Sequence, residues 1–529
     1  MPTDCITFQE SGYFTKIIVD YLNQKSELKS FYNHYPNIDN FALQMSEKSI
    51  NYNSDNRETL VDVLQNQYQN IKTSESTLNN IQLLNQKTTF TVTTGHQLNL
   101  FTGPMYFLYK IISTINLCKQ LKSKYPENDF VPVYWMATED HDFDEINYFN
   151  FKGKKIRWNK PTSGPVGRLS TEGLENVFLA FEKEIGSGDN ANYLRKLFQD
   201  AYLKNANLAD ATRQLANALF GEQGLVILDA DNHELKKIFT PYIHNELVNQ
   251  KSFKKVSETI ALLIEYDIQV NPREVNLFYI TDDLRERIIS DNGIFKINNT
   301  KIEFTKDEIL AELNQFPERF SPNVILRPLY QEVILPNLCY IGGGGEIAYW
   351  LELKTTFESN NTTFPILLLR NSVLIATQKQ ANKADKLELT WQDLFLKQQT
   401  LINNQTRIKS EIMVDFEDQK LFLKNQFKDL YAITTQTDKS FLGAVKAQET
   451  KQNKGLENLE KRLLKAQKRV LNDYLSRATN LQDELFPNQG LQERQLNFCE
   501  LYLEHGNLLI KTISGQLKPL SHEFDIVVI

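Results

Sequence analysis

Three groups of polar residues in this 529-residue chain combine residue types that can perform chemistry. The first is the segment GHQLNLFTG, in which two glycines flank a histidine and three further polar side chains. Glycine lets a ligand approach the backbone, and a helix that starts after this segment would present unpaired amides to an anion. Neither the P-loop pattern nor GxGxxG is present, so an ordinary turn between a strand and a helix explains the segment equally well. The candidate ligand-binding residues here are Gly95, His96, Gln97, Asn99, Thr102 and Gly103.

The second group is the run EDHDFDE, which places five carboxylates around His141 within seven residues. Such a group can bind Mg²⁺, accept a proton from an amine or hold the hydroxyl groups of a substrate. No second histidine stands at ligand spacing, so the sequence assigns no set of metal ligands, and a solvated acidic turn is the alternative. We take Asp140, His141 and Asp142 as candidate catalytic residues and Glu139 as a candidate substrate ligand.

The third group contains four consecutive glycines that follow the run SPNVILRPLYQEVILPNLCYI. Glycine loses much conformational freedom on folding, so four in a row are more useful where a backbone must approach a ligand than as filler. The helix expected after them would make the loop a cradle for an anion, and a flexible surface turn is the alternative. Two arginines nearby offer a bidentate fork for carboxylate or phosphate, although each could instead form a structural ion pair. The candidate binding residues are Asn323, Arg327, Gln331, Gly342, Gly343, Gly344, Gly345, Glu346, Tyr349 and Arg370.

A strand, a helix and a second strand must position the first two groups. The β-branched run TTFTVTT, residues 88–94, predicts a strand. Pro104 suits the first position of a helix, and the apolar residues after it fall on one face at helical spacing. The nearly all-apolar run FVPVYWMAT, residues 130–138, predicts a strand covered on both faces of a parallel sheet. Since a right-handed crossover puts the carboxyl ends of both strands on one edge, the two polar groups should face one crevice.

Further strands are predicted at residues 224–231 and 364–370, which makes the fold class α/β with a parallel sheet. Residues 376–480 contain no proline, are expected to be interrupted near Gly443, and carry an apolar seam at coiled-coil spacing. They predict a helical hairpin or coiled coil that pairs with a second copy or docks on the core. The final run EFDIVVI predicts a strand that could rejoin the core sheet. The chain thus divides into core residues 1–150, an insertion at 151–222, core residues 223–250, a small second insertion at 251–318, core residues 319–375 with the glycine-rich loop, the helical region 376–480 and a C-terminal return to the core at 481–529.

Composition and charge exclude several classes of protein. The net charge is −7, whereas domains that neutralise many backbone phosphates are usually strongly basic, so we expect no nucleic-acid partner. The four cysteines lie far apart and support neither a zinc ribbon nor a disulfide framework. No basic and apolar leader is visible, and no apolar stretch approaches the ~18 residues of a membrane span. We therefore expect a cytoplasmic protein that does not bind a membrane.

Four long motifs resemble those of a known family. They are TTGHQLNLFTGPMYFLYKII, VPVYWMATEDHDFDEIN, FSPNVILRPLYQEVILPNLCYIGGGGEIAYWLELK and PILLLRNS, and in this order, with the coiled-coil region after them, they are similar to the BshC family of bacillithiol biosynthesis. The resemblance covers essentially the whole chain, although many relatives carry glutamine where this chain has His96. It implies a Rossmann-like core akin to class I synthetases, connecting-peptide insertions and a helical coiled coil that forms a homodimer. The implied reaction is that of a cysteine ligase, which joins the carboxyl group of cysteine to the amine of glucosaminyl malate.

The implied reaction needs an activated acid, because a free carboxylate does not condense with an amine in water. We therefore expect ATP and Mg²⁺ to take part, with the acid converted to an acyl adenylate or an acyl phosphate. The nucleotide is expected near Gly95 to Asn99 and Gly103, and cysteine and the sugar near Glu139 to Asp142. Asp140 or His141 would accept the proton of the attacking amine. The glycine-rich loop and the arginine before it would hold malate or phosphate.

Two other classes of function stay open at this point. One is a class I synthetase-like enzyme that uses tRNA or another amine as acceptor. The other is a non-catalytic dimeric binding protein in which the coiled coil is the working part. Deletion of residues 376–480 would abolish the role of such a binding protein, whereas an enzyme would keep its ligand binding and lose dimerisation.

Overall fold

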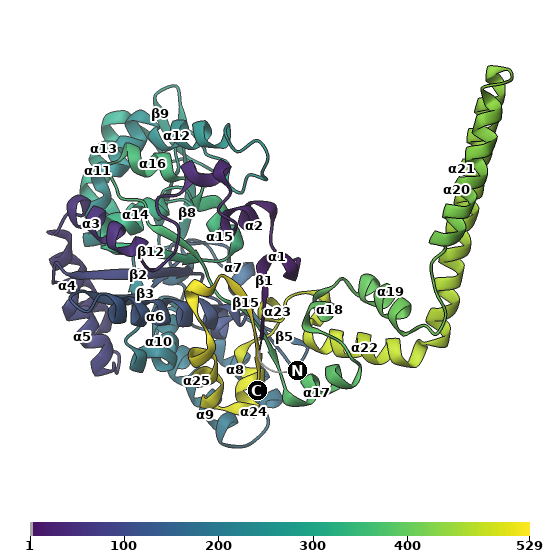
Figure 1. The fold of residues 1–529 in the computed structure, drawn as a ribbon. Coiled ribbons are helices and arrows are strands. Elements are labelled where there is room, and N and C mark those ends of the chain that lie inside the picture. Colours follow the sequence, from purple (N-terminus) through teal and green to yellow (C-terminus); the bar gives the residue numbers. More distant parts are fainter. Residues whose placement is uncertain (1–3) are drawn as a thin grey trace.

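A five-stranded parallel sheet lies at the centre of the larger part of the molecule in the computed structural model, which describes residues 4–529 (Figure 1). Its strands are β2 Thr89–His96, β3 Asp129–Met136, β6 Val226–Asp229, β12 Asn337–Gly342 and β13 Ile366–Leu369. The strand order is β13-β12-β2-β3-β6, and each neighbouring pair runs parallel. The chain moves outward from β2 to β6 on one side and then returns to β12 on the other. Open α/β sheets bind ligands where the order reverses in this way, outside the carboxyl ends of the strands.

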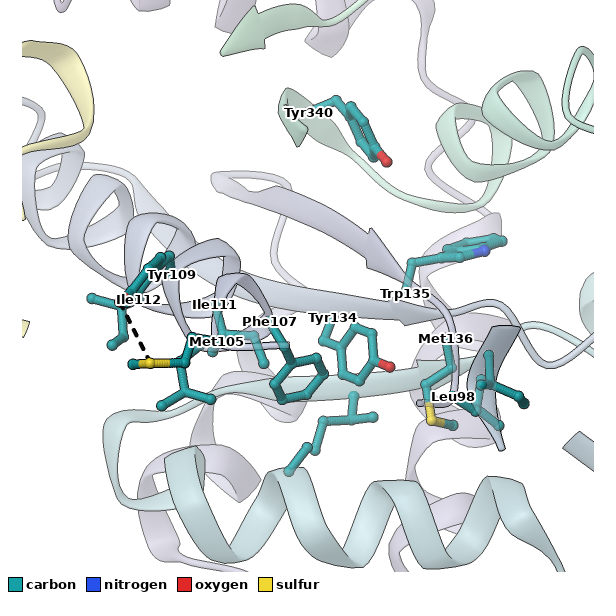
Figure 2. Close-up of a cluster of buried hydrophobic side chains, with 14 of the residues drawn as sticks. Leu98, Met105, Phe107, Tyr109, Ile111, Ile112, Tyr134, Trp135, Met136 and Tyr340 are labelled. Carbon is teal, nitrogen blue, oxygen red and sulfur yellow. Dashed lines mark hydrogen bonds between the residues drawn. The ribbon is translucent and has the colours of Figure 1, made fainter. Parts of the chain in front are cut away.

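Burial on both faces explains why the central strands are β-branched and apolar. All residues of β2 and of β12 are buried. Successive residues of β3 point to opposite faces, so that Tyr134 and Met136 lie on the same side of the sheet as Phe107, whereas Trp135 and Tyr340 lie on the other (Figure 2). Phe107 belongs to α6, Tyr106–Lys124, which packs against β2 and β3. The apolar face predicted for this helix therefore covers the sheet.

The predicted strand–helix–strand unit is confirmed by β2, α6 and β3, and the predicted outer strands are confirmed by β6 and β13. The helix begins at Tyr106 and not at Pro104, and the Met105 amide just before it donates to the carbonyl of Leu496 at 2.9 Å. Strand β12 was not predicted. Its six residues lie between Pro336 and the glycines, in a segment whose apolar run is too short to distinguish a strand from a loop packed on the core.

The segment between β3 and β6 forms a hairpin and three main helices. The hairpin consists of β4, Tyr148–Phe151, paired antiparallel with β5, Lys154–Arg157. Aromatic rings join this insertion to the core, since Phe101 lies 5.5 Å from Phe149 and 5.2 Å from Phe198 between ring centroids. The helices of the segment are α7 Phe143–Ile146, α8 Leu174–Ile185, α9 Asp189–Phe198 and α10 Leu208–Phe220.

A second, antiparallel sheet follows β6 and two helices, and most of it lies in the region expected to be the second insertion, residues 251–318. Its strands are β7 Leu277–Thr281, β8 Leu284–Asp291, β9 Ile294–Ile297, β10 Glu303–Thr305 and β11 Phe320–Pro322, in the order β10-β9-β8-β7-β11. Its helices are α11 His233–Asn249, α12 Lys251–Ile260 and α13 Lys306–Gln315. This sheet is separate from the central one.

Helices from the start of the chain and from the segment around β12 cover the central sheet. The first part of the chain is mostly helical and packs on the core; the Tyr21 hydroxyl, for example, donates to the carbonyl of Leu367 at 2.7 Å. The helices of the two segments are α1 Phe8–Ser11, α2 Lys16–Leu22, α3 Asn40–Asn51, α4 Asn56–Tyr68, α5 Glu75–Leu83, α14 Arg327–Ile334, α15 Gly344–Trp350 and α16 Lys354–Ser359. The strand β1, Asp4–Thr7, precedes them and belongs to another sheet.

The C-terminal part extends away from the body as a long helical hairpin (Figure 1). The hairpin consists of α20, Glu417–Thr434, and α21, Lys439–Val470, which pack along each other. The interruption expected near Gly443 is wrong, because the turn falls at residues 435–438 and Gly443 lies inside α21. Asp438 causes this, since its side chain accepts from the Ser440 amide and caps the helix. The other helices are α17 Gln378–Lys386, α18 Trp391–Phe395, α19 Gln398–Lys409, α22 Asn472–Leu485, α23 Gln492–Gln495, α24 Phe498–His505 and α25 Asn507–Gln516.

The last strand, β15 at Glu523–Val528, lies between β1 and β14, which spans Ser372–Ala376. It runs antiparallel to β1 and parallel to β14. The strand-like ending therefore returns to the body of the molecule, but it joins a three-stranded sheet and does not extend the central one. Within residues 4–529, none of the helices combines the length and the apolar character needed to cross a membrane.

Candidate active site

A cavity of about 590 Å³ opens at the carboxyl ends of β2 and β3. It lies next to the point between β2 and β12 at which the strand order reverses. Part of the antiparallel sheet forms its opposite wall. The structure brings together eleven of the residues that the sequence singled out, namely Gly95, His96, Gln97, Glu139, Asp140, His141, Asp142, Asn323, Arg327, Glu346 and Tyr349. Polar and aromatic side chains that the sequence did not single out complete the lining, among them Tyr106, Lys110, Asn271, Arg273, Phe278, Arg285 and Arg287.

A buried ion pair forms the floor of the cavity. Lys110 of α6 donates to the carbonyl of Gly95 at 2.6 Å, and its Nζ lies 2.5 Å from the carboxylate of Glu346. Glu346 also accepts from the Tyr340 hydroxyl at 2.6 Å and from the Gly343 amide at 2.8 Å. Burial alone would raise the pKa of Glu346, but Lys110 and these hydrogen bonds outweigh it and lower the pKa to about 2. Glu346 is therefore ionised and joins the helices that follow β2 and β12.

Gly95 lets two larger side chains approach the end of β2. A Cβ atom at this position would lie 3.1 Å from the Tyr340 hydroxyl and 3.4 Å from Nη1 of Arg327. Arg327 donates from Nη2 to the Tyr349 hydroxyl at 3.1 Å. Among the described residues, no carboxylate lies within salt-bridge distance of its guanidinium group. Arg327 is thus a cation at the cavity whose bidentate fork is free to meet an anion.

The acidic run after β3 meets an arginine from the antiparallel sheet. Asp140 accepts from Nε2 of Gln97 at 3.1 Å and from the His141 amide at 2.8 Å, and it lies 3.9 Å from Nη1 of Arg285. Burial would raise the pKa of Asp140, but His141, Arg285 and Gln97 outweigh it and hold the pKa well below the usual range. Arg285 itself contacts Nδ1 of His141 and stacks on Phe278, with 3.8 Å between its Cζ and the ring centroid.

Two further contacts fix the walls of the cavity. Glu139 pairs with the fully buried Lys236 of α11. Arg168 bonds both carboxylate oxygens of Asp231, at 2.8 and 2.9 Å, and reaches Asp282 at 3.0 Å. Arg168 therefore ties the first insertion to the end of β6 and to the turn between β7 and β8.

His96 is a neutral side chain in this position. Its Nδ1 donates to the carbonyl of Gln97 at 2.8 Å, and its ring lies between those of Tyr106 and Phe107. Burial, together with the nearby Lys110, lowers the pKa of His96 to about 3. The imidazole therefore carries no charge at neutral pH, and it does not act as a cationic ligand for an anion.

Other predicted residues lie outside the cavity. Asn99 and Gly103 line a neighbouring cavity of about 420 Å³, and Thr102 is buried beside them. The amides at the start of α6 are used by the chain itself, since those of Met105 and Phe107 donate to the carbonyls of Leu496 and Pro104 at 2.9 and 3.1 Å.

The remaining predicted residues have partners within the protein. Gln331 donates to the buried Glu332, and Arg370 forms two hydrogen bonds with the carboxylate of Glu493. The four glycines contribute less to the lining than was expected, because the amide of Gly343 is bonded to Glu346 and Gly344 packs near Phe14. Gly342 ends β12, and Gly345 lies in the first turn of α15.

Comparison with known proteins identifies the family. Residues 1–371 match the model described as "Bacillithiol biosynthesis BshC, N-terminal Rossmann-like domain", and residues 373–529 match "Bacillithiol biosynthesis BshC, C-terminal coiled-coil domain". The chain belongs to the BshC family. It is 64% identical to the protein named "Putative cysteine ligase BshC" of Flavobacterium johnsoniae over the full length of both chains. Proteins of the same name from Christiangramia forsetii and Bacillus cereus are 56% and 29% identical, over 100% and 91% of this chain and 99% and 92% of theirs.

The BshC relatives support a cysteine ligase of bacillithiol biosynthesis, and the two family models confirm the predicted Rossmann-like core and coiled coil. Several lining residues of this BshC site escaped the sequence reasoning. Lys110 had a usable signal, because it is the one charge in the apolar run from Phe107 to Cys118. The sequence around Arg285 and Arg287 shows only the alternating pattern of a short strand. This pattern does not indicate which face of the strand meets a cavity.

The acidic cluster of this BshC chain does not fit a divalent cation as it is placed. Asp140, His141 and Asp142 each offer a ligand atom within 4.8 Å of the others. The guanidinium of Arg285 contacts one of these atoms and lies near another. A divalent cation there would meet a fixed positive charge, so we derive no catalytic step through a metal at this cluster.

Proposed function

We propose that this chain forms an amide bond between the carboxyl group of cysteine and the amine of glucosaminyl malate. The observation that carries the proposal is that one cavity holds both the ionised Asp140 and arginines that have no carboxylate partner among the described residues. The substrates combine the same charges, since the acceptor carries two carboxylates and an amine. The names of the relatives support cysteine as the donor. The acceptor and the type of bond are the proposed part.

The arginines are proposed to bind the malate carboxylates. Arg327 presents a guanidinium fork at the floor, and Arg285, held flat on Phe278, presents another from the opposite wall. Arg273 and Arg287 stand at the rim with their side chains exposed. Guanidinium binds carboxylate through two parallel hydrogen bonds, which gives orientation as well as affinity.

The acidic cluster is proposed to act on the amine. Asp140 stays ionised and attracts the ammonium group, but a carboxylate with so low a pKa is a weak proton acceptor. His141 is half-exposed beside it, and its Nε2 lies 3.9 Å from Asp142. We assign the acceptance of the proton to Nδ1 of the His141 imidazole, which Arg285 releases when it turns to a substrate carboxylate. Loss of the proton leaves the amine nitrogen free to attack the activated carbonyl carbon.

Activation of the cysteine carboxylate is proposed to use ATP as a co-substrate, which turns a carboxylate oxygen into part of a phosphate leaving group. The helix start assigned to the nucleotide from the sequence is used by the chain itself, since the Met105 amide donates to the carbonyl of Leu496. The helix start assigned to malate or phosphate is used by Glu346, which accepts from the Gly343 amide. The side chains that fit phosphate are instead the arginines of the cavity, Arg285, Arg287 and Arg327. In this proposal they share their charge between the phosphates and malate.

We also propose that the protein is a cytoplasmic homodimer. The α20–α21 hairpin leaves a groove of about 1020 Å³ between its helices, lined by Phe422, Leu423, Leu456 and Leu459. Phe422 is 68% exposed and Leu459 is 53% exposed. Apolar side chains at coiled-coil spacing are stabilised when a second pair of helices covers them.

Mass spectrometry of the purified protein with cysteine and glucosaminyl malate, with and without ATP and Mg²⁺, tests the reaction. We expect the condensed thiol together with AMP or ADP, and a loss of at least tenfold in kcat/KM in Arg327→Met. Arg319→Met is the matched control, because Arg319 pairs with Glu312 away from the cavity. The absence of product under every condition, or a fully active Arg327→Met variant, would contradict the proposal.

A further inference from the structure

The loop between α12 and β7, residues 261–276, carries two polar side chains into the cavity. They belong to Asn271 and Arg273. Within the described part of the chain, neither side chain has a hydrogen-bond or ion-pair partner. Their positions therefore depend on whatever holds the backbone of the loop.

The two ends of the loop have anchors of their own. At the far end, the buried side chain of Asn276 accepts from the Arg273 amide at 3.0 Å and donates to Glu246 at 3.2 Å. At the near end, the Tyr266 hydroxyl donates to Asp20 of α2 at 3.1 Å. The middle of the loop lies between these anchors and needs a third.

Glu352, between α15 and α16, supplies the third anchor. Its side chain is buried, with 1% of the residue exposed. Oε1 accepts from the Gln269 amide at 2.8 Å, and Oε2 accepts from the Val270 amide at 3.4 Å. Among the described residues no cation pairs with this carboxylate, and both of its hydrogen bonds go to the loop. A buried carboxylate without a cation is costly, so its placement calls for a role.

We propose that Glu352 is a positioning residue, which holds the middle of the loop in place so that Asn271 and Arg273 reach the anionic part of the substrate. The identity of that substrate rests on the proposed function. The attachment of the loop to Glu352 does not, because it depends only on contacts within the protein.

The protonation of Glu352 gives this role a signature in pH. Burial raises its pKa to about 7, and the two backbone donors oppose the shift. Neighbouring charges are paired elsewhere: Lys354 with Glu358, Lys16 with Glu265 and Lys255 with Glu258, while Asp20 accepts from Tyr266 and Lys251 donates to the carbonyl of Ser359.

The sign of the pH dependence follows from the two states of the loop. When the loop opens, water reaches the carboxyl group and returns its pKa to the ordinary value of 4.5. The closed loop therefore holds the proton more tightly than the open loop. The equilibrium constant for closure of the loop is therefore largest below pH 4.5. It falls by up to about tenfold for each pH unit between 4.5 and 7, and it stays constant above pH 7.

Hydrogen exchange of the purified, substrate-free protein tests the attachment directly. We expect Glu352→Ala to speed exchange of the Gln269 and Val270 amides by at least tenfold, whereas Glu265→Gln, on the same loop but in an exposed ion pair, leaves it unchanged. In the wild type, protection relative to the unfolded chain should fall between pH 5 and pH 7. Glu352→Gln mimics the neutral carboxyl group, so the protection of the Gln269 and Val270 amides should not change with pH over this range.

Kinetics then test the consequence for binding. Glu352→Ala should raise KM for glucosaminyl malate by about tenfold and change kcat by less than twofold, and Arg273→Ala should have a similar effect. The double variant should be no worse than Glu352→Ala alone, because loss of the anchor already removes the contribution of Arg273.

Several outcomes would overturn the inference. The first is an unchanged rate of hydrogen exchange at Gln269 and Val270 in Glu352→Ala. The second is a Glu352→Gln variant in which protection of these amides depends on pH as in the wild type. The third is a KM in the variant with both Glu352→Ala and Arg273→Ala that equals the product of the two single effects. If Glu352→Ala does not fold, the dependence of amide protection on pH in Glu352→Gln is sufficient to decide the role of Glu352. If the wild type makes no product, the proposed function fails, and the exchange measurements still decide the role of Glu352.

Discussion

Asp140 and His141 are neighbours with opposite suitability as proton acceptors. The pKa of Asp140 is held well below its usual range, so its charge is present at every pH above its ordinary value of 3.8 and is lost only in stronger acid. Asp140 therefore contributes no titration to activity near neutral pH. We therefore assign the proton to His141 and the attraction for the amine to Asp140.

We expect His141→Gln to lower kcat by roughly 10²- to 10⁴-fold, because it removes the proposed proton acceptor. Asp140→Asn should also be slower, because it loses the attraction for the amine, but its loss of kcat should be smaller. The measurement is the initial rate of product formation at saturating substrate. A larger loss of kcat in Asp140→Asn than in His141→Gln would exchange the two roles.

The site could be predicted from sequence only as far as strand ends could be placed. Gly95 and Asp140 were brought together correctly, because two predicted parallel strands must end on one edge of a sheet. Arg370 looked like a ligand for an anion, since nothing in the sequence linked it to Glu493, which lies more than a hundred residues later. Lys110 was missed because a lysine in a helix is usually at the surface.

At the scale of elements, the buried pair of Arg370 and Glu493 joins the end of β13 to α23. Both side chains are almost fully buried, and two hydrogen bonds of 3.0 and 2.6 Å connect them. Glu493 also accepts from the Val373 amide at 3.2 Å. Removal of one partner leaves the other charge buried without compensation, which is far more destabilising than loss of an exposed pair.

We expect Glu493→Gln to lower the free energy of unfolding by about 3 to 5 kcal/mol. Glu484→Gln is the matched control, because Glu484 pairs with Lys383 at the surface, and it should change stability by less than about 1 kcal/mol. Urea unfolding followed by circular dichroism provides the comparison. Equal effects of the two substitutions would show that the buried pair does not join these elements.

The elements that sequence reasoning recovered are those with long, regular patterns. Strand β3, of eight residues, gave a long apolar run, and helix α6, of nineteen residues, gave a clear helical periodicity. Strand β12 has only six residues and follows Pro336, so its pattern was too short to read. The face of β8 that meets the cavity depends on how the antiparallel sheet packs on the central one, and no local pattern encodes that packing.

At the scale of the whole molecule, the exposed apolar side chains of the α20–α21 hairpin predict a dimer. We expect light scattering to give twice the chain mass of 61.4 kDa for the wild type, and the single mass for the double variant Phe422→Glu with Leu459→Glu. Charges on both helices would oppose burial of the groove between copies. Leu179→Glu, at an exposed apolar residue of α8, should leave the dimer intact. A monomeric wild type would contradict the proposal.

The position of β15 also governs how a chain emerging from the ribosome can fold. The central sheet is complete once Leu369 has been made, but β1 pairs Asp4 with Ile526 and so waits for the final strand. Until then, both β1 and β14 expose unpaired edges, which are the parts of a nascent protein most prone to bind other chains. Synthesis that stops before Glu523 would leave a finished ligand cavity on a molecule with two open edges, and such a product is a natural target for chaperones and proteases.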